Sequence, residues 1–93
     1  MSAYTLVKVS KSEYGEMVGR LHKLAYDQST NIKKSQLPNP YPYVAVYEVP
    51  EGDDIVLYIN EDATRLFKDF NVELPVVGET DELLSGATPT FVE

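Results

Sequence analysis

The sequence contains no cysteine and no long hydrophobic run, and each absence excludes a class of protein. Without any Cys among its 93 residues, the chain can form neither a disulfide scaffold nor a Cys-based zinc or iron–sulfur site. No apolar stretch approaches the roughly 20 residues that a membrane-spanning helix needs. The N-terminal residues also lack the basic and apolar regions of a signal peptide. We therefore expect a cytoplasmic protein that does not bind membranes.

Side chains suited to catalysis are also scarce. The single histidine, His22, has no carboxylate three or four residues away on the helix predicted below, and a lone histidine of this kind is more often structural than catalytic. The sequence has no glycine-rich loop at a strand–helix junction that could hold a phosphate group. These absences predict a protein that is not an enzyme and that uses no cofactor.

Acidic residues form two groups, which do not suggest a metal site. Glu51, Asp53 and Asp54 precede a predicted strand, whereas Glu61 and Asp62 follow it. A six-residue strand separates its ends by roughly 20 Å at 3.3 Å per residue, and neither group has the ligand spacing of a calcium loop. A turn explains the first group and a helix N-terminus the second. We therefore expect no metal site.

Charge is distributed unevenly along the chain. The formal net charge is -7; residues 1–47 hold six Lys/Arg and three Asp/Glu, whereas residues 48–93 hold two and twelve. Such a field repels nucleic acid and anionic membranes and attracts basic surfaces. Solubility alone is the alternative explanation.

The order of predicted elements indicates one small α+β domain. Alternating apolar residues and turn signals predict strands, the second and third forming a hairpin, and the 3.6-residue periodicity predicts two helices. The order β-α-β-β-α-β, with the last strand least regular, is that of ferredoxin-like folds, in which two helices cover one face of an antiparallel sheet. The predicted strands are 3–9, 43–49, 54–59 and 72–77, and the helices run from 11 to about 30 and from 61 to about 70.

Helix signals support these boundaries. Ser10 and Glu13 fit a capping box for the first helix, and Asn60 fits the N-cap of the second, with Asn71 as its C-terminal stop. A buried stripe is predicted for the second helix, formed by Ala63, Leu66, Phe67 and Phe70. We predict that residues 1–78 form the compact domain. Residues 79–93 form an acidic tail, partly ordered at best, with one helical turn over 79–85.

A long connection joins the first helix to the second strand. Residues 30–42 contain prolines at positions 38, 40 and 42, which favour extended backbone. We interpret this segment as a strap across the sheet, with a functional loop as the alternative.

Two glycines lie inside the first helix, where each costs roughly 1 kcal/mol relative to alanine. On a helical wheel Gly15, Gly19, His22 and Tyr26 form one stripe beside the buried face. The stripe is expected to make a close contact, either with the second helix of the same chain or with a partner.

RNA binding through the central strands is not expected. That mode needs spaced aromatic residues and a basic surround, whereas the segment 54–59 offers one tyrosine in an acidic half of the chain.

These observations favour a small acidic, non-catalytic protein-binding module, such as an inhibitor or adaptor that docks on a basic surface. In a sharper version, its carboxylates imitate the phosphates of nucleic acid. Tyrosine, with seven copies, is favoured at such interfaces. The alternative is a small-molecule sensor that acts as a homodimer, with the tyrosine-rich segment 38–47 lining its site. The candidate partner-binding residues are Gly15, Gly19, His22, Tyr26, Tyr41, Tyr43, Glu51, Asp53 and Asp54.

Overall fold

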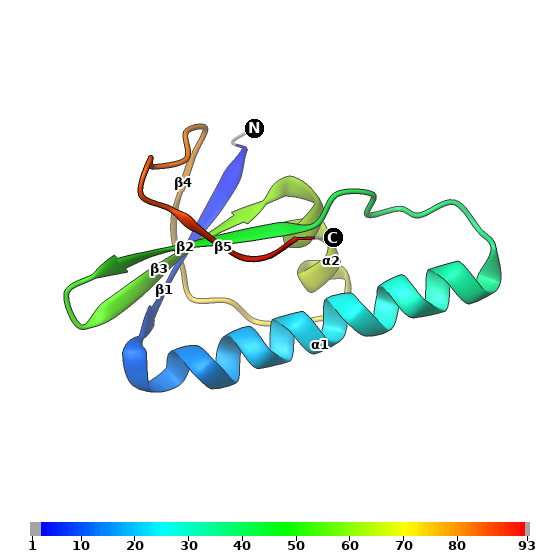
Figure 1. Ribbon diagram of the computed structural model, residues 1–93, viewed down its shortest axis with the longest axis horizontal. Helices are drawn as coiled ribbons and strands as arrows, with labels where there is room; N and C mark the ends of the chain where they lie inside the picture. Colours follow the sequence, from blue (N-terminus) through cyan, green and yellow to red (C-terminus); the bar gives the residue numbers. More distant parts are fainter. Residues whose placement is uncertain (1–2, 93) are drawn as a thin grey trace.

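One antiparallel sheet and two helices account for the fold (Figure 1) of the computed structural model, which describes residues 3–92. The α+β class is therefore confirmed. The elements in chain order are β1 (Tyr4–Ser10), α1 (Lys11–Ser35), β2 (Ala45–Glu51), β3 (Asp54–Asn60), α2 (Glu61–Asp69), β4 (Val76–Thr80) and β5 (Thr88–Val92).

The sheet has five strands in the order β4-β1-β3-β2-β5, and every neighbouring pair is antiparallel. β2 and β3 form the predicted hairpin. Its loop holds Gly52 at a φ of 62°, a left-handed conformation that glycine adopts without a steric penalty. The fifth strand was not predicted. Residues 88–92, which the sequence places in the acidic tail, pair with β2 instead.

Both helices pack on the same face of the sheet, and the core lies between the helices and the sheet. The strand register puts Val7 opposite Leu57 and Val9 opposite Ile55 on this face, as the alternation of residues in 54–59 predicts. Phe67 from α2 is fully buried against them. The other buried members of the cluster are Leu21, Ala25, Val44, Val46, Ile59, Ala63 and Leu66.

The first helix is longer than predicted. It begins at Lys11, where the Ser10 hydroxyl donates a hydrogen bond of 2.9 Å to the Glu13 carboxylate. It ends only at Ser35, before Gln36 in a left-handed conformation. No glycine or proline interrupts the chain between Arg20 and Gln36, so no breaker stops the helix near residue 30. Its C-terminal end consequently projects beyond the sheet (Figure 1).

The second helix ends earlier than its apolar stripe suggests. The Asn60 side chain accepts a hydrogen bond from the Ala63 amide, as predicted for an N-cap, and Asn71 has the positive φ of a C-terminal stop. The prediction that Phe70 is buried was wrong, because it is 42% exposed. The helix ends at Asp69, so Phe70 follows the last helical residue and no longer continues the buried stripe.

The segment after α2 differs most from the prediction. β4 lies at 76–80 and not at 72–77, and residues 81–87 contain no helical turn. Such a short segment is a poor helix by itself, because nucleation fixes several residues for one hydrogen bond. Two small turns replace it: the Thr80 hydroxyl accepts from the Glu82 amide at 3.2 Å, and the Ala87 amide donates to the Leu84 carbonyl at 3.0 Å.

Candidate functional site

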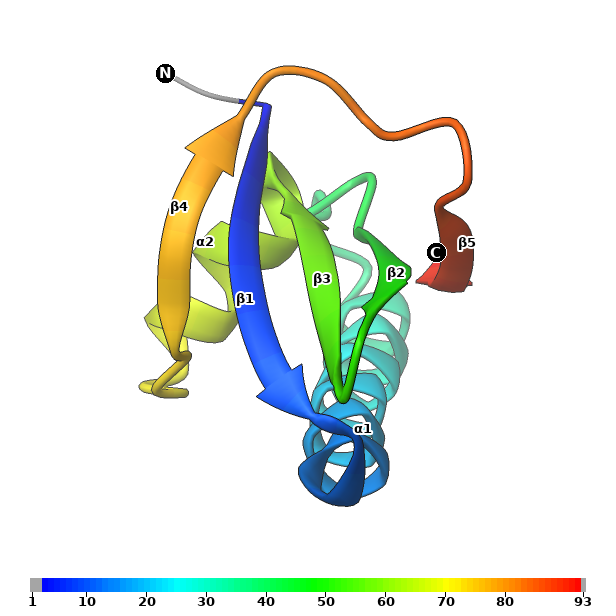
Figure 2. The same ribbon diagram turned by 90° about the vertical axis from the view of Figure 1, so that its left-hand side faces the viewer.

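Both helices lie on one side of the sheet (Figure 2), and apolar side chains line the opposite face. On β1 and β3 the pairs Leu6–Tyr58 and Lys8–Val56 are directly opposite each other. On β2, Val49 is opposite Val56. Because the helices cover only the other face, the cover that the described residues 3–92 offer these side chains is the loop at 81–87.

The loop at 81–87 covers this face incompletely and leaves a groove, which we call the sheet groove. It has a volume of about 250 Å³. Two of its apolar side chains are largely accessible to solvent, Val77 at 61% and Leu84 at 56%. The residues that line it are Leu6, Lys8, Val49, Glu51, Val56, Tyr58, Val77 and Leu84.

Three tyrosines pack together on the same face of the sheet. The ring centroid of Tyr4 lies 6.3 Å from that of Tyr47 and 6.2 Å from that of Tyr58, both in edge-to-face arrangements. Such pairs stabilise each other beyond the area they bury. Tyr58 is only 7% exposed, so its ring cannot stack on a nucleic-acid base.

Carboxylates stand at one end of the sheet groove. Glu51 and Asp54 face each other in the register at the tip of the hairpin, and Asp53 lies in the exposed loop between them. The Lys8 Nζ atom lies 3.0 Å from Glu51 Oε1 and 3.9 Å from Asp54 Oδ2. This hydrogen bond to Glu51 raises the pKa of Lys8. The three carboxylates predicted to act together are therefore neighbours, with one lysine beside them.

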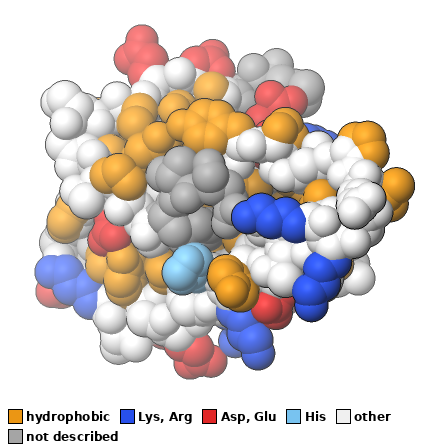
Figure 3. Space-filling view, turned by 45° about the vertical axis from the view of Figure 1, so that its right-hand side comes forward, with side chains coloured by type: hydrophobic (Ala, Val, Ile, Leu, Met, Phe, Trp, Pro, Cys, Tyr) orange, Lys and Arg blue, Asp and Glu red, His pale blue; other side chains and the backbone are white. Residues whose placement is uncertain are grey.

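The loop that carries Leu84 adds further negative charge near the groove, through Asp81 and Glu82. Residues 69–93 contain six Asp/Glu and no Lys or Arg, and they supply both outer strands and the loop that carries Leu84. In contrast, α1 carries five of the eight Lys/Arg residues of the chain. Figure 3 shows several of the basic side chains on the molecular surface. α1 also carries the acidic residues Glu13, Glu16 and Asp27, so the helix keeps an excess of positive charge.

The glycine stripe lies on the other side of the molecule, on α1. A Cβ atom built at Gly15 or Gly19 would meet no atom within 4 Å, so the proposed close contact with α2 was wrong. His22 and Tyr26 have exposed side chains. The structure therefore does not bring the stripe together with the carboxylates of the sheet groove.

Tyr41 fastens the connection between α1 and β2 to α2. Its hydroxyl donates a hydrogen bond to Asp69, which raises the pKa of Tyr41. The guanidinium carbon of Arg65 lies 5.3 Å from the Tyr41 ring centroid, and Arg65 Nη2 donates to the Pro40 carbonyl at 2.8 Å. The cavity beside Tyr41 measures only about 10 Å³, room for a single water molecule. The sequence predicts that this connection is a strap across the sheet. The structure shows a strap here, but it is attached to α2.

Tyr43 is fixed through its backbone and presents its ring to solvent. Its amide donates to Asp62 Oδ2 at 2.9 Å, and its carbonyl accepts from Asn60 Nδ2 at 2.8 Å. The ring borders a shallow depression of about 290 Å³ that also includes Tyr4 and Glu61. This depression is separate from the sheet groove, with which it shares no lining residue.

Sequence reasoning missed the apolar part of the sheet groove, chiefly Leu6, Val77 and Leu84. One signal was present in the sequence: the strands 43–49 and 54–59 are apolar on both faces, yet two helices can cover only one. An apolar second face in a sheet with one helical layer implies another covering element or partner.

Other classes of site find no support within residues 3–92. No three His, Asp or Glu side chains of the described chain come together as metal ligands, and none of the described helices is long and apolar enough to cross a membrane. Comparisons with models of protein families, with curated proteins and with solved structures give no match.

Proposed function

We propose that this protein is a non-catalytic protein-binding module that docks the helix-free side of its sheet on a basic surface of a larger cytoplasmic partner, as an inhibitor or adaptor. One observation carries the proposal. The sheet groove combines solvent-exposed apolar side chains with a margin of carboxylates, and the chain that forms its outer wall has no Lys or Arg after position 68.

This combination matches the anatomy of protein interfaces. Their energy comes mainly from an apolar centre that is fully desolvated on binding, and the polar margin sets specificity and the rate of encounter. Val77 and Leu84 supply exposed apolar surface, while Glu51 and Asp53 supply charge beside it. A net charge of -7 would steer the module toward a basic partner over several ångströms before contact.

The sharper version, imitation of nucleic acid, concerns the same carboxylates. A basic groove that evolved to hold phosphates would accept a surface with negative charges on the hairpin and on the loop at 81–87. We also propose that the fold is a ferredoxin-like arrangement, formed by β4-β1-β3-β2 and the two helices, to which β5 adds an outer strand.

A ligand-sensing role finds less support from the cavities. The sheet groove and the depression beside Tyr43 measure about 250 and 290 Å³, below the roughly 300–1,000 Å³ of most ligand pockets. A sensor would therefore need a second copy of the chain to complete its site. A thermal-shift screen against metabolites tests this alternative, because a ligand that binds the folded state raises its melting temperature.

Charge reversal separates specific docking from general solubility. The test variant carries Glu51→Lys, Asp53→Lys and Asp54→Lys. The matched control carries Glu13→Lys, Glu16→Lys and Asp27→Lys on α1, which change the net charge equally on the opposite side. Both variants are first checked by circular dichroism and thermal melting.

Immobilised wild-type and variant proteins are then used to capture partners from a lysate at increasing salt. We expect the wild type and the α1 control to retain one stoichiometric partner, and the hairpin variant to lose it. We also expect retention to fall with salt, because exposed charges are screened over about 8 Å at physiological ionic strength. Equal capture by both variants, or capture that is insensitive to salt, would argue against the proposal.

A further inference from the structure

We infer that the sheet groove holds one large apolar side chain of the partner, presented on a segment in which Lys or Arg residues flank it. This inference rests on the proposed function and specifies the partner's chemistry. It would distinguish the protein from a module that binds by charge alone.

The walls of the groove support an apolar occupant. Leu6, Val56 and Tyr58 come from the two central strands, Val77 comes from β4, and Leu84 comes from the loop at 81–87. The carbonyl of Leu84 accepts the Ala87 amide in a turn, so this wall has a defined backbone position. Exposed apolar side chains that line the same groove favour an apolar group beside them, because it removes them from water.

The volume of the groove limits the size of the occupant. The groove offers about 250 Å³. That volume suits one leucine, methionine or phenylalanine side chain and is too small for a helix or a second strand. The partner should therefore contribute a single anchor residue, as interface hot spots commonly do.

The charges around the groove specify the residues beside that anchor. Glu51 and Asp54 lie at the hairpin end, where Lys8 is their cationic neighbour. Asp81 and Glu82 belong to the loop that carries Leu84. The carboxylate of Asp81 is fixed in position by a hydrogen bond of 2.9 Å that it accepts from the Ala3 amide. A segment with basic residues on both sides of its anchor would meet carboxylates from both the hairpin and the loop.

A second copy of this chain fits the groove less well. Two copies each carry a net charge of -7 and repel one another before contact. A basic partner gains from the same field. We therefore assign the groove to a different, basic protein, and self-association becomes an outcome that the experiment can detect.

The experiment uses three synthetic nonapeptides as probes and the full chain labelled for methyl and amide NMR. The first peptide has leucine at its centre and lysine at the flanking positions, with glycine elsewhere. The second replaces the leucine with serine, and the third replaces the lysines with glutamate. Titrations follow the methyl signals of Leu6, Val56, Val77 and Leu84 at low and at physiological salt.

We expect the leucine–lysine peptide to shift these methyl signals and to bind at least fivefold more tightly than the serine peptide, with weaker binding at higher salt. Leu84→Ser should remove that preference. Leu37→Ser is the matched control, because Leu37 is similarly exposed, at 68%, but lies beyond the end of α1. Both substitutions are at solvent-exposed side chains, so the fold should persist in each variant.

Three results would overturn the inference. Equal binding of the leucine and serine peptides would show recognition by charge alone, which leaves the proposed function intact. Absence of any shift at the four methyl groups with the leucine–lysine peptide would show that the groove does not accept the anchor. Shifts of the same signals when the wild-type protein is concentrated without peptide would identify a second copy as the occupant. Failure of the proposed function itself would appear separately, as salt-insensitive capture from the lysate.

Discussion

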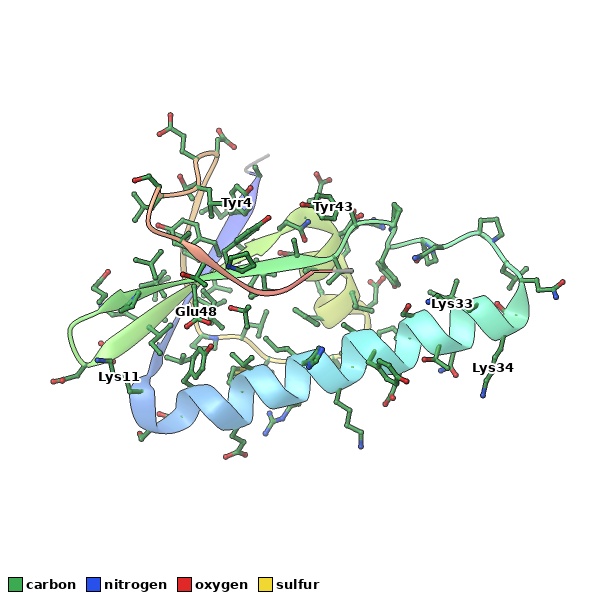
Figure 4. All side chains as sticks on the ribbon, in the orientation of Figure 1. Tyr4, Lys11, Lys33, Lys34, Tyr43 and Glu48 are labelled. Atoms are coloured by element: carbon green, nitrogen blue, oxygen red, sulfur yellow. The ribbon has the colours of Figure 1, made fainter. Side chains whose placement is uncertain are left out.

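The hydroxyl of Tyr14, on α1, donates a hydrogen bond to the carboxylate of Glu48, on β2. Figure 4 shows Glu48 on the strand above the helix. The same carboxylate oxygen accepts from Thr90 Oγ1 at 3.1 Å, and Thr90 belongs to β5. A single half-buried side chain therefore joins the first helix to the last strand, two elements that are far apart in sequence.

Removing Glu48 should loosen the last strand more than the rest of the sheet. Glu48→Ala leaves both hydroxyl groups without their acceptor, and hydrogen bonds to charged groups contribute about 1.5–3 kcal/mol. We expect a loss of about 1–3 kcal/mol in the free energy of unfolding, and faster amide exchange at residues 88–92 than at β1 or β3. Thr90→Val, which removes one of the two bonds, should have a smaller effect. Unchanged exchange at β5 in Glu48→Ala would contradict this role.

The half-buried hydroxyl of Tyr14 also predicts how stability depends on pH. Burial, followed by the hydrogen bond to Glu48, raises the pKa of Tyr14 above 10. The unfolded chain loses this proton near pH 10, whereas the folded chain keeps it to higher pH. In that window the unfolded state binds fewer protons, so the free energy of unfolding should fall as the pH rises above 10. Denaturant titrations between pH 8 and 11 measure the slope, and an equally steep slope in Tyr14→Phe would contradict the assignment.

The glycine stripe is exposed, so a larger side chain there should raise stability, whereas in a packed contact it would lower stability. Gly19→Leu places its side chain in open space, and leucine is the better helix former by up to about 1 kcal/mol. We expect the isolated chain to become more stable by up to that amount, measured by thermal or denaturant unfolding. If partner capture is lost while stability rises, the stripe contributes to docking. A loss of stability in this variant would contradict the placement of the side chain in open space.

Two phenylalanines of α2 should respond very differently to truncation. Phe67 is fully buried, so Phe67→Ala should cost about 3–5 kcal/mol. Phe70→Ala should cost less than about 1 kcal/mol, because Phe70 is largely exposed. Leu57→Ala, in the central strand, should cost about 2–5 kcal/mol. Similar losses for Phe67→Ala and Phe70→Ala in urea titrations would contradict the observed end of α2.

The sequence predicted the elements whose signals are local. The alternation in β3, the Asn60 cap and the turn at residues 51–54 each depend on a few neighbouring residues, and all three were found where predicted. The end of α1 was misplaced because nothing within residues 20–36 stops a helix, so the chain offers no local signal for an end near residue 30.

The candidate site was predicted only in its charged part. Glu51, Asp53 and Asp54 are adjacent in sequence, so a turn brings them together without any knowledge of the fold. The apolar part joins Leu6 to Val77 and Leu84, from opposite ends of the chain, and that proximity depends on β4 pairing with β1. β5 escaped prediction for the same reason, since its pairing with β2 has no local signature and Pro89 argues against a strand.

The position of β4 and β5 has a consequence for the chain during synthesis. The first 69 residues already contain both helices and the three strands β1, β3 and β2, but both edges of that smaller sheet are unpaired. Exposed strand edges are templates for aggregation. The last quarter of the sequence then adds one short strand to each edge, so a nascent or truncated chain that ends before residue 76 should be far more prone to aggregate than the finished protein.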